Sequence, residues 1–268
     1  MVEGTENARS SRRLGDQIIW GQASIAQQEG PDCPAKPLID RRRAAAELAV
    51  FGSLAFVLRI AFDPFFWRFA GPVSLIATLV CLALYLRRRG EGWSSFGLIP
   101  LEGVRAKLMV LPQALLVFGF FAAAVAGVLH GGEALGWDFM NVVPQGVEDR
   151  WGDVQGNLPV FLLWLGIVWT AAAFGEEMFF RGFLVTRAAV LFRGAPFGTL
   201  FAVLVAAILF GLGHFYYQGL RGLVMTTAIG IAFGAAFLLT KRNLWPIVLV
   251  HGIVDTITFT ALYLGLEN

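Results

Sequence analysis

The segment EEMFFR, from Glu176 to Arg181, places three formal charges inside one long apolar stretch of the chain. At the centre of a bilayer span, a charged residue is unfavourable by roughly 2.5 to 3.5 kcal/mol on insertion scales. Three charges so close together need partners and a purpose. We interpret this segment as the core of an intramembrane active site.

The spacing within this segment separates the roles of its two acids. Glu177 and Arg181 are four residues apart with the acid nearer the amino terminus, which is the better orientation for an ion pair on a helix. We expect Arg181 to neutralise Glu177. Glu176 lies about 100° around the axis from Glu177, so it stays free for chemistry. The alternative is a structural salt bridge with a second acid at a helix end.

A second polar group within an apolar run is His214, in the sequence FGLGH that begins at Phe210. Phe210 lies one turn before His214 on the same helix face, and the two glycines let another backbone or a substrate come close. A lone histidine that ends a span is more often interfacial, and this is how we interpret His130. Taken by itself, His214 would be assigned a structural role.

A third group consists of His251 and Asp255, again four residues apart. Their helix is expected to begin after Asn243 with Leu-Trp-Pro, because proline suits a first turn in which its missing N–H costs nothing. The two side chains then share one face. A hydrogen bond within the helix is the structural alternative, but a carboxylate at that depth needs a further reason.

Together these residues could hydrolyse a peptide bond. That reaction needs an activated water, a proton donor for the leaving amine and a stabiliser for the oxyanion. Glu176 would be the general base, and His214 would help to hold or polarise the water. His251 and Asp255 would orient the carbonyl group or stabilise its developing charge.

The same residues also leave open the alternative of a metal site. Glu176, His214 and His251 resemble the histidine and carboxylate ligands of a catalytic zinc site with one open position. The chain has no HExxH segment, so the sequence requires no cofactor but leaves Zn²⁺ or another divalent metal as an alternative. Neither Cys33 nor Cys81 is near the cluster, and no covalent nucleophile is indicated.

The composition predicts the elements that hold these residues. Of 268 residues, 57% are hydrophobic and 15% charged, which is typical of a polytopic membrane protein and predicts an all-α transmembrane bundle. Apolar runs of about 17 to 25 residues indicate about seven to eight spans. The candidates are 44–62, 70–86, 108–130, 158–175, 196–214, 220–240 and 244–265. Residues 1–43, with mixed charges, predict a flexible cytoplasmic tail ahead of a transmembrane domain at 44–268.

Basic residues flank these runs on alternate sides, which all fall on one face of the membrane. They are Arg41 to Arg43, Arg87 to Arg89, Arg105, Lys107, Arg181, Arg187, Arg193, Lys241 and Arg242. By the positive-inside rule this side is cytoplasmic, and it includes the amino terminus. We expect a bacterial cytoplasmic membrane protein. The net charge of +2 is explained by these flanks, so no nucleic-acid partner is expected.

The expected spans leave the depths of the site residues in conflict. Glu176 would lie near the cytoplasmic end of its helix, whereas His214 follows Pro196 by almost a full crossing at about 1.5 Å per residue. Either the helix that carries His214 begins in the cytoplasm, or the helix that carries Glu176 is long and tilted. The sequence does not choose between these arrangements.

Three ordered segments resemble the motifs of one family. Glu176 to Arg181 resembles the EExxxR signature of the CPBP family, which groups CAAX prenyl endopeptidases with bacteriocin-processing and immunity-associated membrane proteins. Phe210 to His214 resembles its FxxxH motif, and His251 to Asp255 its HxxxN/D motif. The resemblance covers about residues 158–260, which would form the catalytic core.

The resemblance implies an intramembrane endopeptidase that acts on a membrane-associated or lipid-modified, CAAX-like peptide or protein. In such enzymes the residues matching Glu176 and His214 activate water, and those matching His251 and Asp255 form an oxyanion site. Glu177 and Arg181 would support the site. Many members carry Asn where this chain has Asp255. An ionised carboxylate only accepts hydrogen bonds, so Asp255 must be protonated, orient His251 or help to bind a metal.

Two other functions are weighed against hydrolysis. The first is a non-proteolytic membrane partner or bacteriocin-immunity protein, in which the polar cluster only fixes helix packing. The second is a transporter with an acidic proton relay, which is disfavoured because the chain lacks paired halves with matching broken helices. Retained function in a Glu176→Ala variant would favour the first.

Overall fold

The computed structural model describes residues 39–266, and these form an all-α structure without strands. The elements in order are α3 (Arg41–Arg88), η1 (Trp93–Phe96), α4 (Gly103–Ala134), η2 (Asp138–Met140), α5 (Gln145–Trp151), α6 (Leu158–Ile167), η3 (Val168–Val185), α7 (Thr186–Leu191), α8 (Gly198–Leu239) and α9 (Trp245–Leu264). The expected tail, except for its last five residues, and Cys33 lie outside the described residues. The first helix of the described residues begins at Arg41, inside the range expected for the tail.

Five helices of the described chain are long and apolar enough to cross a membrane. They are Arg41–Arg88, Gly103–Ala134, Leu158–Leu191, Gly198–Leu239 and Trp245–Leu264. The all-α prediction is therefore confirmed, while these five helices are fewer than the seven to eight spans expected. The difference lies in the two longest helices.

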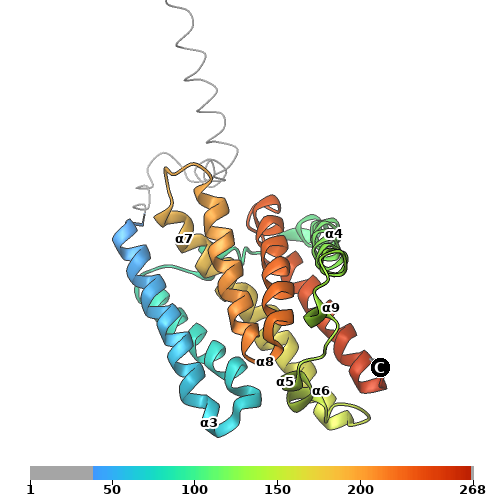
Figure 1. Cartoon of the computed structure of the whole chain (residues 1–268). Helices are drawn as coiled ribbons and strands as arrows, with labels where there is room; N and C mark the ends of the chain where they lie inside the picture. The colour runs from blue at the N-terminus through green and yellow to red at the C-terminus, as the bar shows by residue number, and fades with distance from the viewer. Residues whose placement is uncertain (1–38, 267–268) are drawn as a thin grey trace, which may run out of the picture. The chain divides into compact units, whose positions relative to one another are not determined.

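Both of these helices are interrupted near their middle. Phe66 in α3 and Gly219 in α8 have backbone angles outside the helical region, and Gly219 has a positive φ of 58° that glycine adopts without strain. At these points the chain turns back on itself, so that α3 and α8 each consist of two arms that run side by side (Figure 1). The seven predicted apolar runs correspond to these four arms and the three other helices.

Small residues hold the arms of α8 together. A Cβ atom at Gly211 would lie 2.0 Å from Oγ1 of Thr227, and one at Gly234 would lie 2.5 Å from Cγ1 of Val203. Close approach of this kind is the usual use of glycine between membrane helices. The pairing runs antiparallel and brings His214 in the first arm close to the second.

A single continuous helix carries the acidic motif. The segments α6, η3 and α7 join end to end from Leu158 to Leu191, so Glu176 lies near the middle and the expected helix end at 175 is wrong. A long helix is what one of the two arrangements considered for the depths of Glu176 and His214 requires. The η3 segment is a π-helix of 18 residues. This conformation is rare in proteins, and where it occurs it often lies at a functional site.

The helix that carries His251 begins as predicted. Pro246 lies in the first turn of α9, and the side-chain oxygen of Asn243 accepts a hydrogen bond of 3.2 Å from the backbone N–H of Trp245. The loop before it is fixed by Leu244, whose N–H donates to the carbonyl of Gly97 at 2.9 Å. The start of α9 is therefore tied to η1.

Buried ionic groups join α3, the loop after it and α7. Arg187 donates to Glu47 and to Glu91, at 2.6 Å each, and Arg43 donates to the same two acids. Partial burial opposes ionisation of Glu91, but the hydrogen bonds and charges of Arg187 and Arg43 outweigh it and lower its pKa below the usual 4.5. This four-residue network fixes one end of the bundle.

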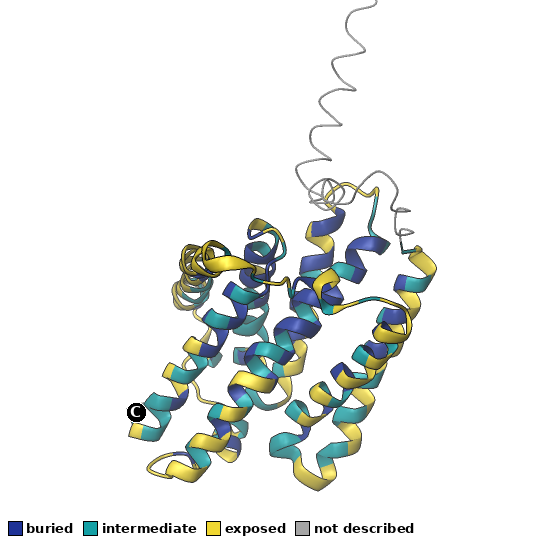
Figure 2. Ribbon diagram, turned by 180° about the vertical axis from the view of Figure 1, so that it is seen from behind, coloured by how far each residue is buried: buried dark blue, intermediate teal, exposed yellow. Residues whose placement is uncertain are grey.

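The outward helix faces are strongly apolar. Large hydrophobic side chains are exposed along α3, α4, α8 and α9, including Phe65, Leu115, Ile208 and Ile257. Figure 2 shows these exposed positions on the outer sides of the helices, with buried residues turned inward. A soluble monomer rarely exposes so much contiguous apolar surface, and a lipid environment explains it.

Candidate active site

Glu177 lies at the centre of the polar cluster. It is fully buried, and its Oε1 accepts hydrogen bonds from Nη1 of Arg181 at 2.9 Å and from Nδ1 of His251 at 2.8 Å. The ion pair expected between Glu177 and Arg181 is present. The bond to His251 links η3 to α9 and could not be found from spacing, because the two residues are 74 positions apart.

His251 brings the remaining acids into the cluster. Because Nδ1 donates to Glu177, Nε2 is the atom that faces Asp255 Oδ2 at 3.5 Å and Glu176 Oε2 at 4.0 Å. The side chains of Glu176 and Asp255 are 21% and 31% exposed, so these two acids are reachable while Glu177 is not. A distance of 4.0 Å is too long for a hydrogen bond and leaves room for an oxygen atom that contacts both groups.

His214 adjoins this cluster without a direct hydrogen bond to it among the described residues. Its Nδ1 donates to the carbonyl oxygen of Phe210 at 2.9 Å, which leaves Nε2 as an acceptor. The ring of Phe210 lies 4.6 Å from the imidazole and 4.4 Å from the guanidinium carbon of Arg181. His214 is also within electrostatic range of His251 and Asp255. Three helices therefore converge on one region, as the sequence predicts.

The metal alternative fits this arrangement poorly. Between residues 39 and 266, no three histidine, cysteine or acidic side chains are placed to hold a metal ion. The predicted ligands Glu176, His214 and His251 do not form such a group, because only Glu176 and His251 lie close together. No step of the chemistry below is derived through a metal.

Two apolar concavities of the described structure lie outside the polar cluster. One, of about 530 Å³, lies between the end of α4 and α8, with Gly131 and Ile208 in its wall. The other, of about 330 Å³, lies between α4 and α9. Its wall includes Val250 and Val254, which adjoin His251 and Asp255 in the sequence. The second concavity is thus formed partly by α9, the helix that also carries His251 and Asp255.

A second group of polar and aromatic side chains lies one helical turn from the cluster. The guanidinium of Arg150 in α5 stacks on the rings of Tyr217 at 4.6 Å and Trp164 at 5.5 Å. Trp151 and Phe259 close the group, with ring centroids 5.5 Å apart. The sequence did not predict this packing, because nothing local signals that α5 folds onto the helices.

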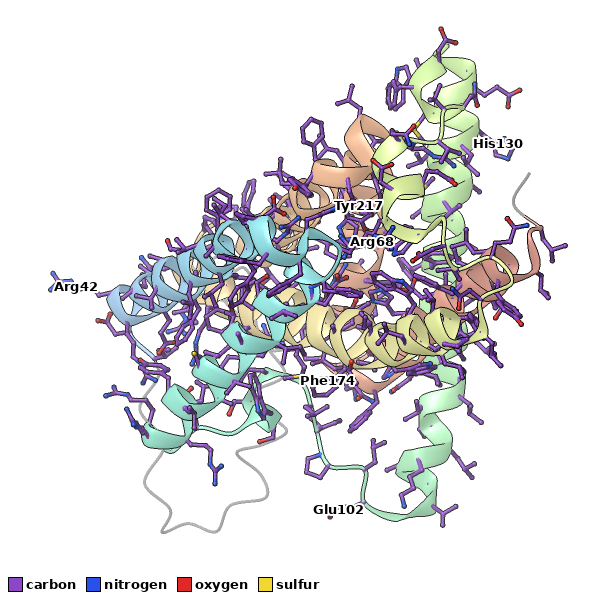
Figure 3. All side chains as sticks on the ribbon, turned by 90° about the horizontal axis from the view of Figure 1, so that it is seen from below. Arg42, Arg68, Glu102, His130, Phe174 and Tyr217 are labelled. Atoms are coloured by element: carbon purple, nitrogen blue, oxygen red, sulfur yellow. The ribbon has the colours of Figure 1, made fainter. Side chains whose placement is uncertain are left out.

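The placement of these side chains can be followed from the end of the bundle at which α5 lies (Figure 3). Tyr217 and Arg68 lie near the centre of that view, whereas Arg42, Glu102 and His130 project away from the helices. His130 is exposed, in agreement with the interfacial role expected for it. Within the aromatic group, Trp164 and Phe259 are buried and Tyr217 is half-buried.

The comparison with protein families agrees with the geometry. Residues 158–257 match the family model described as "Type II CAAX prenyl endopeptidase Rce1-like". This match supports the resemblance of the segment to the CAAX-type proteases of the CPBP family. No curated protein and no solved structure matches the chain.

The CAAX-protease segment runs from the start of α6 to the middle of α9 and contains all seven residues selected from the sequence. With the five apolar helices, this family identifies an integral membrane protein. The matched model describes a CAAX prenyl endopeptidase, which supports a protease with a peptide or protein substrate. Helices α6 to α9 are therefore the part of the fold that carries the matched segment.

Proposed function

We propose that this protein is an intramembrane endopeptidase that cleaves a CAAX-like peptide through a water molecule activated by Glu176 and His214. The observation that carries the proposal is the separation of 4.0 Å between Glu176 Oε2 and His251 Nε2, where the Glu176 side chain is partly exposed and His251 is buried. A water or a carbonyl oxygen beside the two atoms can contact a base and a hydrogen-bond donor at once. This is the geometry that hydrolysis requires.

The attack would proceed without a covalent intermediate. Glu176 takes a proton from water as the water oxygen bonds to the carbonyl carbon of the scissile peptide. Nε2 of His214, an acceptor because Nδ1 donates to Phe210, holds the second hydrogen of that water. When the C–N bond breaks, Glu176 returns the proton to the leaving nitrogen, so that an acid and an amine result.

His251 would stabilise the oxyanion. Its orientation is fixed on one side by Glu177, which accepts from Nδ1, and on the other by Asp255 near Nε2. The carboxylate behind the ring is therefore Glu177, which would favour the charged, donating form of the imidazole. Asp255 lies on the Nε2 side, where it would help to orient the ring, and this is a role that an acid can fill where many relatives have Asn.

The apolar groove beside α9 suits a lipid-modified substrate. Its wall is formed by α4 and α9, and Val250 and Val254 lie next to the residues of the proposed oxyanion site. A prenyl or acyl chain attached to the peptide could lie there while the peptide bond reaches Glu176. The basic end of the bundle, with Arg43 and Arg187, would face the cytoplasm of a bacterial cell.

The test is cleavage of a prenylated peptide ending in Cys-aliphatic-aliphatic-Met by purified protein in liposomes. Glu176→Gln keeps the shape of the side chain but removes the base, so we expect the rate to fall by a factor of about 10² to 10⁴. Glu102→Gln, at an exposed position far from the cluster, is the matched control and should cleave normally.

Both variants are compared with the wild type by thermal unfolding, so that loss of activity is separated from loss of fold. Metal analysis of the same samples tests whether the reaction proceeds with water alone. A well-folded Glu176→Gln protein that cleaves at the normal rate would contradict the proposal. It would favour the non-proteolytic alternative, in which the cluster only fixes helix packing.

A further inference from the structure

Two arginine side chains from distant parts of the chain converge over one glycine. Nη2 of Arg150 and Nε of Arg59 each lie 3.9 Å from the position that a Cβ atom of Gly71 would occupy. These two nitrogen atoms, Nη2 of Arg150 and Nε of Arg59, are thus separated by no more than twice 3.9 Å. Like charges repel at this range, and the repulsion grows as water is excluded.

Neither arginine is fully satisfied by its neighbours. Arg150 is 6% exposed, it makes no ion pair or hydrogen bond within the described residues, and its buried Nε has no partner. Burial lowers the pKa of the Arg150 guanidinium. Arg59 is bonded to Asp63 through Nη1, but its buried Nη2 also lacks a partner within residues 39–266. The unpartnered atoms, Nε of Arg150 and Nη2 of Arg59, belong to the same guanidinium groups as the two atoms nearest to Gly71, so each group has donors left for an anion.

The surroundings of Arg150 would strengthen the binding of an anion. The rings of Trp164 and Tyr217 stack on its guanidinium and exclude water from it. Such contacts offset part of the cost of a buried cation but do not use its N–H donors. A carboxylate, with two oxygen atoms, matches the fork of donors that a guanidinium presents.

The position of the pair relates it to the proposed active site. Tyr217 follows His214 by three residues on α8, and Phe259 follows Asp255 by four on α9, so both helices place the aromatic group one turn beyond the polar cluster. One turn is about 5.4 Å. Three extended residues span at most about 10 to 11 Å, so a short peptide could reach from Glu176 to Arg150.

We propose that Arg59 and Arg150, which converge over Gly71, bind the free C-terminal carboxylate of the peptide that Glu176 and His214 cleave. The inference rests on the proposed function, in which the substrate ends a few residues after its scissile bond. The arginine pair would select substrates by the distance between the scissile bond and the C-terminus of the peptide. It would make the protein an endopeptidase for C-terminal segments and not for internal ones.

The experiment compares two prenylated peptides of identical sequence, one with a free C-terminal carboxylate and one with a C-terminal amide. The readout is the ratio of their kcat/KM values. Wild-type protein should prefer the carboxylate by a factor on the order of 10 to 100. Arg150→Gln should bring the ratio close to one.

A second pair of variants tests the site without removing either arginine. Gly71→Asp places a carboxylate between the guanidinium groups, where the geometry leaves ordinary contact distances. It should raise KM for the carboxylate peptide about tenfold or more and reduce the ratio. Gly71→Asn has the same shape without the charge and should keep a ratio close to that of the wild type.

The outcomes separate this inference from the function on which it rests. Equal cleavage of both peptides by the wild type would overturn the carboxylate site and leave the peptidase intact, as would a Gly71→Asp variant with an unchanged ratio. Wild-type protein that cleaves neither peptide would contradict the proposed function itself. If the effect of Arg150→Gln follows the content of anionic lipid in the liposomes and not the peptide end, the site holds a lipid phosphate and the carboxylate assignment is wrong.

Discussion

Glu177 serves two neighbours through one oxygen atom. The same Oε1 binds Arg181 and His251, so this side chain both neutralises a buried cation and fixes the ring that faces the exposed acids. Neutralising Arg181 concerns the stability of the fold, whereas holding His251 concerns the orientation of its imidazole ring. A pair of variants can separate them.

Glu177→Leu should unfold far more easily than the wild type, since it leaves the guanidinium of Arg181 buried and uncompensated. Loss of one partner from a buried pair costs about 3 to 5 kcal/mol. The double variant Glu177→Leu with Arg181→Met removes both charges and should recover most of this stability. Thermal unfolding in detergent measures both changes.

The same double variant should remain poorly active, because Nδ1 of His251 then has no acceptor to hold the ring. We expect a loss of about 10- to 100-fold, as for other residues that orient a functional histidine. Peptide cleavage measured beside the unfolding curves gives the answer. Full activity in the stable double variant would mean that Glu177 does no more than balance Arg181.

At the scale of elements, the hairpin of α8 depends on how closely its arms approach. His214 lies in the first arm, five residues before the turn at Gly219, so its position relative to Glu176 follows from the packing of that arm. The contact between Gly211 and Thr227 is the tightest that these arms make at a glycine.

Gly211→Ala should therefore weaken the fold, and Gly213→Ala should not. A Cβ atom at Gly211 meets Oγ1 of Thr227 at 2.0 Å and the carbonyl of Leu223 at 2.8 Å, whereas nothing lies within 4 Å of one at Gly213. Overpacking of this kind costs about 1 to 3 kcal/mol. Melting temperatures of the two variants, two residues apart on one helix, provide the comparison. Equal values would show that the arms separate readily.

Side-chain contacts within one helix can be predicted from the sequence, whereas contacts between helices cannot. Glu177 with Arg181 and Phe210 with His214 were found from spacing alone, because helical geometry fixes which neighbours meet. The bond from His251 to Glu177 and the stacking of Tyr217 on Arg150 depend on tertiary packing, which leaves no local pattern.

Helix limits show a similar division. The apolar runs located every arm, but the run that ends near residue 175 was taken as the end of its helix because charges follow it. The helix continues to Leu191, since Glu177 and Arg181 satisfy each other inside it. Hydropathy also could not tell that two pairs of runs are joined through single non-helical residues, Phe66 and Gly219.

At the scale of the described molecule, two ends of the bundle differ in how they hold charge. The end with Arg43, Glu47, Glu91 and Arg187 is a closed network in which each acid contacts both arginines. The opposite end, near α5, contains the pair Arg59 and Arg150 with unsatisfied nitrogens. The first arrangement is suited to stability and the second to binding.

The closed network should make stability sensitive to acid. The pKa of Glu91 is lower in the folded protein than its usual 4.5, so the unfolded chain takes up the proton first as the pH falls. The stabilisation is complete above about pH 4.5 and is lost as the pH falls through the folded pKa. Thermal unfolding from pH 7 to pH 3 should show this decline.

Glu91→Gln removes the titrating group and should lower the melting temperature at pH 7 while flattening the fall in acid. Glu102→Gln, at an exposed acid without an ion pair in the described part of the chain, should follow the wild-type curve. If all three proteins lose stability in parallel, the acid sensitivity arises elsewhere.

The order of the helices has a consequence for the time at which such a site can exist. Glu176 precedes His251 by 75 positions, and His251 and Asp255 are carried by α9, the last helix described. A ribosome must therefore have made nearly all of this helical unit before the imidazole can meet its carboxylates. Until then the growing chain has Glu176 without the imidazole of His251, so the proposed hydrolysis cannot begin while the chain is being inserted into the membrane.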